Sequence, residues 1–374
     1  MGFRFNLEGP LLRYVLPQIT FALQIYGTWA YSHKFCYAQL FHRFHYKATS
    51  IVFIIIECVL TIIIWIIWVR LIYFNKPMEQ PIIPPYMLVP VGSSSNQVIS
   101  TKPPKYYQCD KNGYPPWCTH CQSLKLSRSH HSKQVGRCIL RFDHYCAWIG
   151  CVIARNNYRL FLQYVGWFNL LLLWYWLTIA VFIRTIGMLN GNVIVGFILS
   201  CLGWMMTLGL FISHIYYMSN NKTSIETLDA ERGKRKKHKM MVTNDEIEHA
   251  RIEYNRKYFC YYNQQDKFRY VVELTADEFA KCWKKRSFWI NAREFLGSDI
   301  IFWLFPWGSY FPDLRKREAS SFQSYGQSYD LENIIGPYKE VLSSSAIDLI
   351  ENRITQGNYV TKFLAYGDNL DINM

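Results

Sequence analysis

Residues 118–161 read CTHCQSLKLSRSHHSKQVGRCILRFDHYCAWIGCVIARNNYRLF. The stretch combines a cysteine pair at C-x2-C spacing with a later histidine and a later cysteine, which together make the ligand set of a tetrahedral structural zinc site. The predicted ligands are Cys118, Cys121, His131 and Cys138. A redox role for the cysteine pair is the alternative, but no βαβ pattern surrounds it. A structural zinc is therefore the favoured interpretation.

A few residues after the predicted zinc ligands, the chain reads Asp143-His144-Tyr145-Cys146. A thiol becomes a strong nucleophile when a base takes its proton, and the base works best when a third group orients it. Here His144 can act as the base for Cys146, and Asp143 can orient the histidine. In an extended segment, residues 144 and 146 point to one side and residue 145 to the other. The pattern predicts a cysteine nucleophile.

Four apolar runs are long enough and carry few enough charges to cross a membrane. They extend from Tyr14 to Tyr31, Ser50 to Phe74, Leu160 to Ile183 and Val193 to Met218. The first run is the weakest, because Pro17, Gln18 and Gln24 lower its hydropathy. Glu57 lies inside the second run, where we predict that it packs against polar groups such as Gln24; a functional titrating role is the alternative.

The predicted fold class is an α-helical polytopic membrane protein, with four transmembrane helices and a zinc-binding cysteine-rich domain between spans 2 and 3. The chain then divides into an N-terminus with the first two spans (1–74), the cysteine-rich domain (75–157), the other two spans (158–218) and a C-terminal region (219–374). No cleavable signal peptide is apparent, because the N-terminus lacks a basic region leading into a short apolar core.

Basic residues predict the orientation, since Lys and Arg gather at the cytosolic ends of spans. They are Arg137, Arg141, Arg155 and Arg159 before the third run, and Lys222, Arg232, Lys234, Arg235, Lys236, Lys237 and Lys239 after the fourth. The N-terminus, the cysteine-rich domain and the C-terminal region are therefore expected in the cytosol, although Lys34, Arg43 and Lys47 argue mildly against this. The net charge of +14 indicates contact with anionic membrane lipid, and no nucleic-acid partner is expected.

On these motifs, residues 118–161 resemble the cysteine-rich domain of the DHHC-type protein S-acyltransferases, or palmitoyltransferases. After the fourth run, Thr223-Ser224-Ile225-Glu226 is similar to the TTxE motif of that family. Residues 291–297 (NAREFLG), followed by Trp303 and Pro306, resemble its C-terminal Asn-containing motif. Lys76-Pro77-Met78 matches the family's Asp-Pro-Gly motif poorly. The reading DHYC in place of DHHC is similar to that of fungal members.

The resemblance implies two zinc sites, of which only the first is complete in this chain. The second site would need ligands at Ser132, Val135 and Tyr145, which leaves Cys151 as its one remaining ligand. We therefore predict one structural zinc per chain. Tyr145 then fills a vacated ligand position and takes no part in the chemistry. Ala147 replaces the usual proline of the family, so the local backbone is expected to differ.

The resemblance also implies a two-step transfer from palmitoyl-CoA. His144, oriented by Asp143, would deprotonate Cys146, which attacks the thioester and becomes S-acylated. A membrane-proximal cysteine of a substrate protein would then accept the acyl group. Residues expected to bind the donor are Lys125, His130 and Arg141 at the CoA phosphates and Trp148 at the mouth of the acyl cavity. A solvated basic face and a membrane-interface anchor are the alternatives for these residues.

Two functions of other classes remain open. One is a zinc-bearing membrane scaffold with a relic Asp-His-Tyr-Cys, and the intact Asp143, His144 and Cys146 argue against it. The other is a transporter that uses Glu57 and His214 as titrating groups. Four spans without an internal repeat argue against the transporter.

The C-terminal region carries weaker patterns. A helix is predicted from Asp245 to Phe259, and a flexible Ser-rich stretch from Ser320 to Ser328. The run from Ile300 to Trp307 is too short to span a membrane, and we expect a membrane-interface contact or the core of a small subdomain. Asn221-Lys222-Thr223 is a glycosylation acceptor by pattern, but in the cytosol it is expected to carry no glycan. The multi-pass protein is expected in an endomembrane or the plasma membrane.

Overall fold

The structure, a computed structural model, describes residues 10–86, 88, 103–187, 190–232, 256–307 and 339–365. The chain divides into two compact units, each made of three separated segments. The unit that we call the helical unit comprises Met1–Lys76, His144–Tyr216 and Phe295–Tyr310. The unit that we call the cysteine-rich unit comprises Pro77–Asp143, Tyr217–Glu294 and Phe311–Met374.

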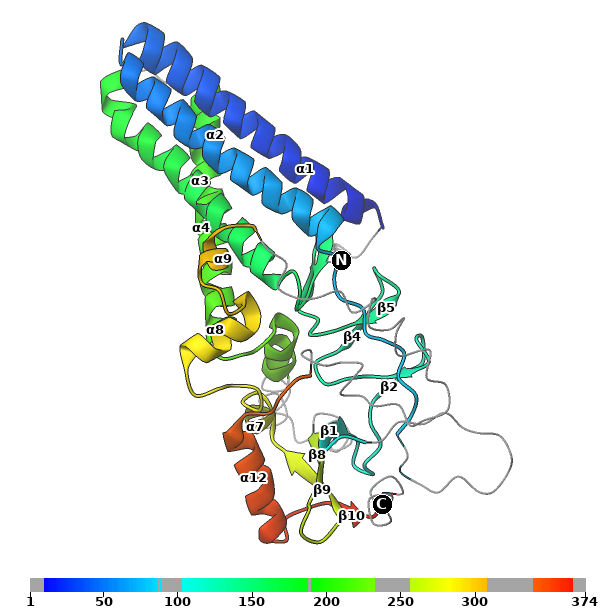
Figure 1. Cartoon of the computed structure of the whole chain (residues 1–374). Helices are drawn as coiled ribbons and strands as arrows, with labels where there is room; N and C mark the ends of the chain where they lie inside the picture. Colours follow the sequence, from blue (N-terminus) through cyan, green and yellow to red (C-terminus); the bar gives the residue numbers. More distant parts are fainter. Residues whose placement is uncertain are drawn as a thin grey trace, which may run out of the picture. The chain divides into compact units, whose positions relative to one another are not determined.

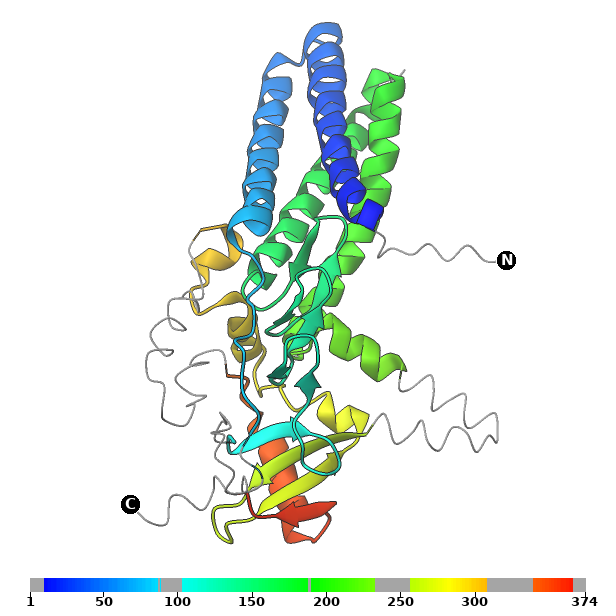
Figure 2. The ribbon, with the colours of Figure 1, turned by 90° about the vertical axis from the view of Figure 1, so that its right-hand side faces the viewer.

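Long helices dominate the helical unit and run alongside one another (Figures 1 and 2). They are α1 (Pro10–Trp29), α2 (Lys47–Val69), α3 (Tyr158–Ile186) and α4 (Gly191–Ser219). The π-helical η1 (Ala30–Arg43) continues α1, and the π-helical η2 (Arg70–Phe74) continues α2. The last residues of α4 belong to the cysteine-rich unit. The short α9 (Ile301–Leu304) also belongs to the helical unit.

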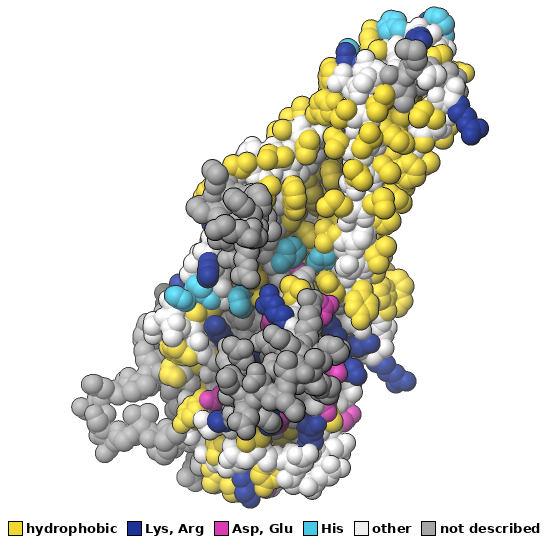
Figure 3. Space-filling model, turned by 180° about the vertical axis from the view of Figure 1, so that it is seen from behind, with side chains coloured by type: hydrophobic (Ala, Val, Ile, Leu, Met, Phe, Trp, Pro, Cys, Tyr) yellow, Lys and Arg dark blue, Asp and Glu magenta, His cyan; other side chains and the backbone are white. Residues whose placement is uncertain are grey.

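Among the residues that the structure describes, three helical stretches are long and apolar enough to cross a membrane, namely Lys47–Phe74, Tyr158–Arg184 and Gly191–Ser219. They coincide with the second, third and fourth predicted spans; the second begins a few residues earlier than predicted and ends at the predicted Phe74, and the other two extend one or two residues beyond both predicted ends. Apolar side chains cover most of the face of the helices that Figure 3 shows. On α2, Ile55, Val59, Ile62 and Ile66 are exposed as well. Such a surface is what lipid contact requires.

The first predicted span, residues 14–31, is helical, but it is not among the stretches apolar enough to span. Its polar residues recur every four positions and so lie on one helix face. Gln24 donates to Tyr164 Oη of α3 at 2.9 Å, and Thr28 Oγ1 lies 3.4 Å from Tyr175 Oη. The polar groups that lower its hydropathy therefore face the neighbouring helix.

Glu57 is completely buried within α2. Its carboxylate accepts hydrogen bonds from the hydroxyls of Ser32, Thr61 and Tyr175 at 2.9, 3.0 and 2.9 Å. The expectation that it packs against polar groups agrees with these contacts, but Gln24 was the wrong partner. The first two helices run antiparallel, so Ser32 is level with Glu57, whereas Gln24 accepts from Trp65 two turns away.

Short hairpins carry the cysteine-rich stretch. They pair β2 (Trp117–Cys118) with β3 (Ser123–Leu124), β4 (His130–Ser132) with β5 (Arg137–Ile139), and, in the helical unit, β6 (His144–Cys146) with β7 (Cys151–Ile153). All three pairs are antiparallel. Each hairpin is too small to be stable alone, so its conformation depends on ligands or on packing.

The cysteine-rich unit also contains a four-stranded antiparallel sheet. Its strand order is β1 (Tyr106–Cys109), β8 (Lys257–Tyr262), β9 (Arg269–Leu274) and β10 (Thr361–Phe363). The helices in the described part of this unit are a stretch at residues 224–232, α7 (Ala276–Phe279), most of α8 (Phe288–Leu296) and α12 (Ser344–Thr355). Phe259, Val272, Trp283 and Ile350 form a core in which α12 packs on one face of the sheet (Figure 2).

The predicted helix at residues 245–259 is wrong where the structure describes it. Residues 257–259 belong to β8, whose aromatic side chains suit a strand and which pairs with β1, about 150 positions earlier in the chain. Residues 245–255, the Ser-rich stretch 320–328 and the basic run 234–239 lie outside the described residues.

Candidate active site

The four predicted zinc ligands of the cysteine-rich unit converge. They are Cys118 from β2, Cys121 from the β2–β3 turn, His131 from β4 and Cys138 from β5, and their ligand atoms all lie within 4.8 Å of one another. His131 Nδ1 is 3.5 Å from Cys118 Sγ and 3.3 Å from Cys121 Sγ. Ligands about 2.0 to 2.3 Å from a tetrahedral zinc would be separated by about 3.5 Å. The geometry and the donor set both fit zinc.

The local fold explains why these side chains meet. His131 and Cys138 are direct cross-strand partners in the β4–β5 hairpin. Cys121 follows Cys118 by one turn, and its amide N–H donates to Cys118 Sγ. Burial, together with His120 and Lys125, lowers the pKa of His131. A lowered pKa favours the neutral imidazole, which is the form that binds a metal.

Ser132 stands where the resemblance would require a ligand of a second zinc. Its hydroxyl donates to Gln134 Oε1 at 3.1 Å and accepts from the backbone N–H of Val135. Ser132 thus shapes the turn between β4 and β5, and the apolar side chain of Val135 offers no donor atom to a metal.

Asp143, the predicted orienting group, is buried at the end of a segment of the cysteine-rich unit. Its carboxylate accepts two hydrogen bonds from Ser224, one from the backbone N–H at 2.8 Å and one from the hydroxyl at 2.7 Å. Ser224 is the first residue of the helix at residues 224–232. A carboxylate at a helix N-terminus is stabilised by the helix dipole and the free N–H groups.

A capping box begins that helix. The backbone N–H of Thr223 donates to the Glu226 carboxylate at 2.8 Å, and the backbone N–H of Glu226 donates to Thr223 Oγ1 at 3.3 Å. This reciprocal pair satisfies two N–H groups that a helix start leaves free. The motif at residues 223–226 therefore has a direct physical role, which is to fix the helix start that holds Asp143.

A buried polar network surrounds the capping box. Arg128 Nε and Nη2 donate to the two carboxylate oxygens of Glu226 at 2.7 and 2.8 Å. Arg128 also donates to the side chain of Asn221, whose amide group donates in turn to Trp283 O and the Glu294 carboxylate. Reasoning from the sequence missed Ser224, Arg128 and Asn221 as support for the site. The Thr-x-x-Glu capping pattern was the signal that could have found this region.

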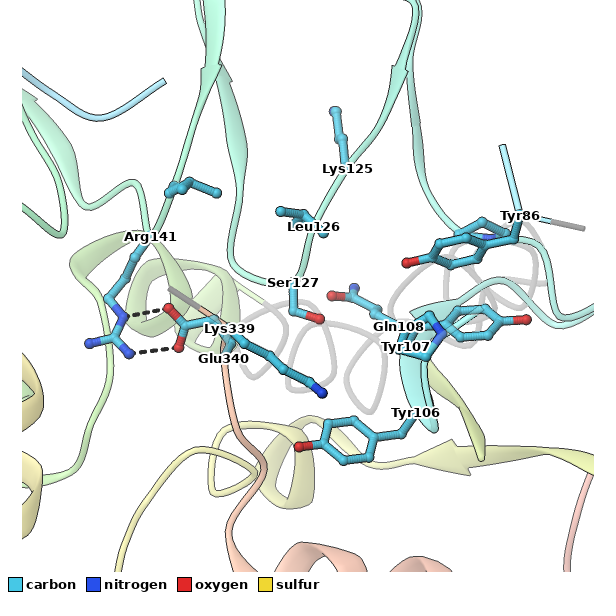
Figure 4. A pocket seen from close by; sticks show the side chains of 13 residues that line it. Tyr86, Tyr106, Tyr107, Gln108, Lys125, Leu126, Ser127, Arg141, Lys339 and Glu340 are labelled. Atoms are coloured by element: carbon cyan, nitrogen blue, oxygen red, sulfur yellow. Dashed lines mark hydrogen bonds and ion pairs between the residues drawn. The ribbon is translucent and has the colours of Figure 1, made fainter. Parts of the chain in front are cut away.

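The residues expected to bind CoA phosphates have different surroundings. Lys125 and Arg141 both line one pocket of the cysteine-rich unit, together with Tyr106, Gln108, Ser127 and Lys339 (Figure 4). Arg141 is buried, and its guanidinium donates to both carboxylate oxygens of Glu340 at 2.6 and 2.7 Å. Arg141 therefore already has an anionic partner. The third of these residues, His130, packs against an aromatic side chain, with its ring 5.2 Å from that of Phe142.

Cys146 lies in the β6–β7 hairpin of the helical unit. His144, Tyr145 and Cys146 are extended, so His144 and Cys146 share one side of the hairpin. Cys146 is half-buried. The backbone N–H of Gly150, whose φ is +88°, donates to Cys146 O and closes the turn. Trp148, in the same turn, is 55% exposed, so its indole is free to contact lipid or an acyl chain.

The ring of His144 lies among aromatic residues of α3 and α4. Its centroid is 5.2 Å from that of Phe161 and 5.6 Å from that of His214. His214 is buried, and its Nδ1 lies 2.9 Å from Tyr158 Oη. His214, which the sequence suggested only as a transport residue, thus contacts the proposed base. No sequence spacing links it to His144, 70 positions earlier.

Tyr145 points away from that side of the hairpin and toward α1. The Arg13 guanidinium lies 5.8 Å from the centre of its ring. Burial raises the pKa of Tyr145 above its ordinary range, so the phenol is protonated at neutral pH. On the same helix, Pro17 packs against Gly150 so closely that a Cβ there would lie 2.8 Å from Pro17 Cγ. The start of α1 therefore supports the hairpin from its far side.

Known proteins match both the cysteine-rich stretch and the whole chain. Residues 111–231 match a family model described as DHHC palmitoyltransferase. A Saccharomyces cerevisiae protein named palmitoyltransferase PFA5 is 40% identical over 378 residues, covering 96% of this chain and 95% of its own. Proteins of the same name from Candida glabrata and Kluyveromyces lactis are 42% and 38% identical, covering 94% and 95% of this chain and 93% and 96% of their own.

Proposed function

Because the chain belongs to the DHHC palmitoyltransferase family and so is a protein palmitoyltransferase, we propose that Cys146 is the residue that carries the acyl group. The observation that carries this proposal is the hairpin, which puts the half-buried Cys146 thiol on the same side as the His144 ring. Phe161 and His214 hold that ring. A nucleophile beside a positioned base is the arrangement that thioester exchange needs.

The proposed reaction has two balanced steps. In the first, His144 takes the proton of Cys146, the thiolate attacks the thioester carbon of palmitoyl-CoA, and the carbon–sulfur bond to CoA breaks. The CoA thiolate leaves with the proton from His144. In the second step, the thiol of a substrate protein gives its proton to His144 and attacks the acyl group, and Cys146 is released. Each step exchanges one thioester for another, so no nucleotide hydrolysis is required.

Asp143 is proposed to orient His144, which follows it directly in the chain. The two hydrogen bonds from Ser224 support this role, because they hold both carboxylate oxygens of Asp143 in place at a helix start. A fixed anion beside an imidazole selects one tautomer and stabilises the imidazolium that forms during the reaction.

Zinc is proposed to be structural, bound by Cys118, Cys121, His131 and Cys138. Four protein ligands leave no open position for a substrate, so the metal would stabilise the hairpins without touching the acyl group. One site per chain is expected, since Ser132 and Val135 cannot take part in a second.

The CoA headgroup is proposed to bind where Lys125 lies, in the pocket that Lys339 and Ser127 also line. Lys side chains are point charges suited to phosphate. His130 remains a candidate for the same role. Arg141 is less suited, because a phosphate there would have to displace Glu340. Trp148 is proposed to contact the acyl chain, because its indole is exposed beside Cys146 in the hairpin turn.

We further propose four spans, with α1 and η1 as the first, so that the N-terminus, the cysteine-rich domain (75–157) and the C-terminal region (219–374) all lie in the cytosol. The polar face of α1 supports this, because a polar stripe satisfied by other helices leaves an apolar face for lipid. Anionic membrane lipid and substrate proteins with cysteines near the membrane are the proposed partners.

Incubation of the purified protein with labelled palmitoyl-CoA tests the proposal. The protein should take up label that hydroxylamine removes, and Cys146→Ala should abolish the uptake. Cys201→Ala, which changes a cysteine of α4 in the same unit, is the matched control and should label normally. A membrane scaffold or a transporter would take no such label. Normal labelling of Cys146→Ala would refute the assignment.

A further inference from the structure

Cys151 lies directly opposite Cys146 across the β6–β7 hairpin. Both are free thiols. Residues directly opposite in an antiparallel pair have Cα atoms about 4.5 to 5.5 Å apart and side chains on the same face. A disulfide bridges Cα atoms about 4.4 to 6.8 Å apart. The register of the hairpin therefore gives the two backbones a separation that a disulfide can bridge, and rotation of the side chains would bring the sulfurs together.

Cys151 has no zinc partners left, because Ser132, Val135 and Tyr145 stand at the other three positions of the second site. It is outside the four converging zinc ligands, and the proposed acyl transfer uses only Cys146. Its neighbour Val152 pairs with Tyr145 on the other face of the hairpin. Cys151 therefore presents its thiol on the face of the hairpin that carries Cys146.

We propose that Cys151 is the resolving thiol of Cys146, so that oxidation of Cys146 by hydrogen peroxide ends in a Cys146–Cys151 disulfide. The Cys146 thiolate attacks the peroxide oxygen, the O–O bond breaks, and a sulfenic acid and hydroxide form. The Cys151 sulfur then attacks the Cys146 sulfur, and the sulfenic oxygen leaves as hydroxide. Overall, two thiols are oxidised, one peroxide is reduced, and two molecules of water form.

The two thiols differ in a way that sets this order. Burial and the nearby Cys146 raise the pKa of the Cys151 thiol to about 12, so Cys151 is protonated at neutral pH and does not react first. Cys146 shares its face with His144, which can take its proton. Once Cys146 is a neutral sulfenic acid, its charge no longer opposes ionisation of Cys151, and His144 is available for the second proton.

The disulfide blocks acylation reversibly. A bonded Cys146 cannot attack a thioester, but it also cannot be oxidised further to the irreversible sulfinic acid. Cellular thiols reopen the bond by exchange. In a reducing compartment such a bond is transient, as expected of a redox-sensing pair.

Mass spectrometry of the full-length protein tests the proposal without acyl-CoA. Trypsin releases residues 142–155 as one peptide that contains both thiols. After treatment with hydrogen peroxide, this peptide should be lighter by two hydrogen atoms and resist alkylation, and dithiothreitol should restore two free thiols. A sulfinic acid on Cys146 beside an alkylated Cys151 would overturn the proposal.

Self-acylation of cysteine variants provides a second test of the proposed disulfide. Dithiothreitol should restore self-acylation of the peroxide-treated wild type, whereas Cys151→Ser should lose it permanently. Cys58→Ser removes an exposed cysteine of α2 and should behave as wild type. Full recovery of self-acylation by Cys151→Ser after dithiothreitol would contradict the inference. If this variant misfolds, the mass of the wild-type peptide 142–155 still shows whether the disulfide forms. The functional consequence rests on the proposed role of Cys146, but the disulfide is detected independently, so the two can fail separately.

Discussion

His144 is the proposed base for Cys146, and its replacement tests that role most directly. Without a base, only Cys146 that is already ionised can react, so His144→Ala should slow self-acylation by about 10²-fold or more at neutral pH. The residual rate should rise with pH, because the thiolate fraction rises. Initial rates measured at a series of pH values test this. A His144→Ala protein with the wild-type rate would show that another group takes the proton.

Tyr145 separates a structural role of the motif from a chemical one. Its ring faces Arg13 on the side of the hairpin opposite Cys146, so Tyr145→Phe should keep both self-acylation and zinc content. Tyr145→His should not recruit a second zinc, because Ser132 and Val135 remain unable to bind one. Self-acylation and elemental analysis measure both outcomes. Loss of activity in a folded, zinc-loaded Tyr145→Phe protein would make the phenol a catalytic group.

The helix at residues 224–232 depends on a buried ion pair as well as on its capping box. The side chains of Arg128 and Glu226 are 1% and 16% exposed, and without Glu226 the buried guanidinium is left with its longer ion pair with Glu340, at 3.4 Å. Glu226→Gln should therefore lower the free energy of unfolding by about 3 kcal/mol. Asp229→Asn, which breaks the exposed pair with Arg232 on the same helix, should cost less than about 1 kcal/mol.

Thermal unfolding of both variants provides the measurement. Glu226→Gln should also reduce acylation, because the helix start that holds Asp143 becomes less ordered. Equal and small losses of stability in the two variants would show that the Arg128–Glu226 pair contributes no more than a surface pair.

The four candidate ligands on the β2–β3 and β4–β5 hairpins predict how many zinc ions each chain binds. The purified protein should contain about one zinc per chain, since each structural site needs four ligands. Cys138→Ser should lose the metal and unfold at lower temperature, because the binding free energy of a structural zinc contributes to folding. Cys151→Ser should keep the metal. Elemental analysis of the three proteins is the test, and two zincs in the wild type would contradict the loss of the second site.

Elements whose residues are close in the sequence were predictable, and those that join distant segments were not. The zinc ligands and the extended Asp-His-Tyr-Cys segment follow from local spacing and alternation. The sheet joins β1 to β8 across about 150 positions, and no local pattern in the aromatic-rich β8 indicates which strand it pairs with. The contacts of Glu340 with Arg141 and of His214 with His144 arise in the same way. They depend on tertiary packing that spacing does not encode.

For the whole molecule, the orientation in the membrane cannot be tested at the natural acceptor Asn221. Its side chain is fully buried and donates to Trp283 O and the Glu294 carboxylate through the nitrogen that a glycan would modify. The folded protein excludes a glycan there on either side of the membrane. Absence of glycan at Asn221 therefore supports the fold and not the orientation, so the orientation needs a different probe.

Introduced cysteines supply that probe. Asn190 is exposed between α3 and α4, and Gln265 is exposed between β8 and β9. If both the cysteine-rich domain and the C-terminal region are cytosolic, residue 190 lies on the opposite side. In sealed vesicles with the cytosolic face outward, a membrane-impermeant maleimide should label Gln265→Cys above the wild-type background at once, and Asn190→Cys only after detergent. Immediate labelling of Asn190→Cys with protection of Gln265→Cys would reverse the orientation and remove the catalytic hairpin from cytosolic acyl-CoA.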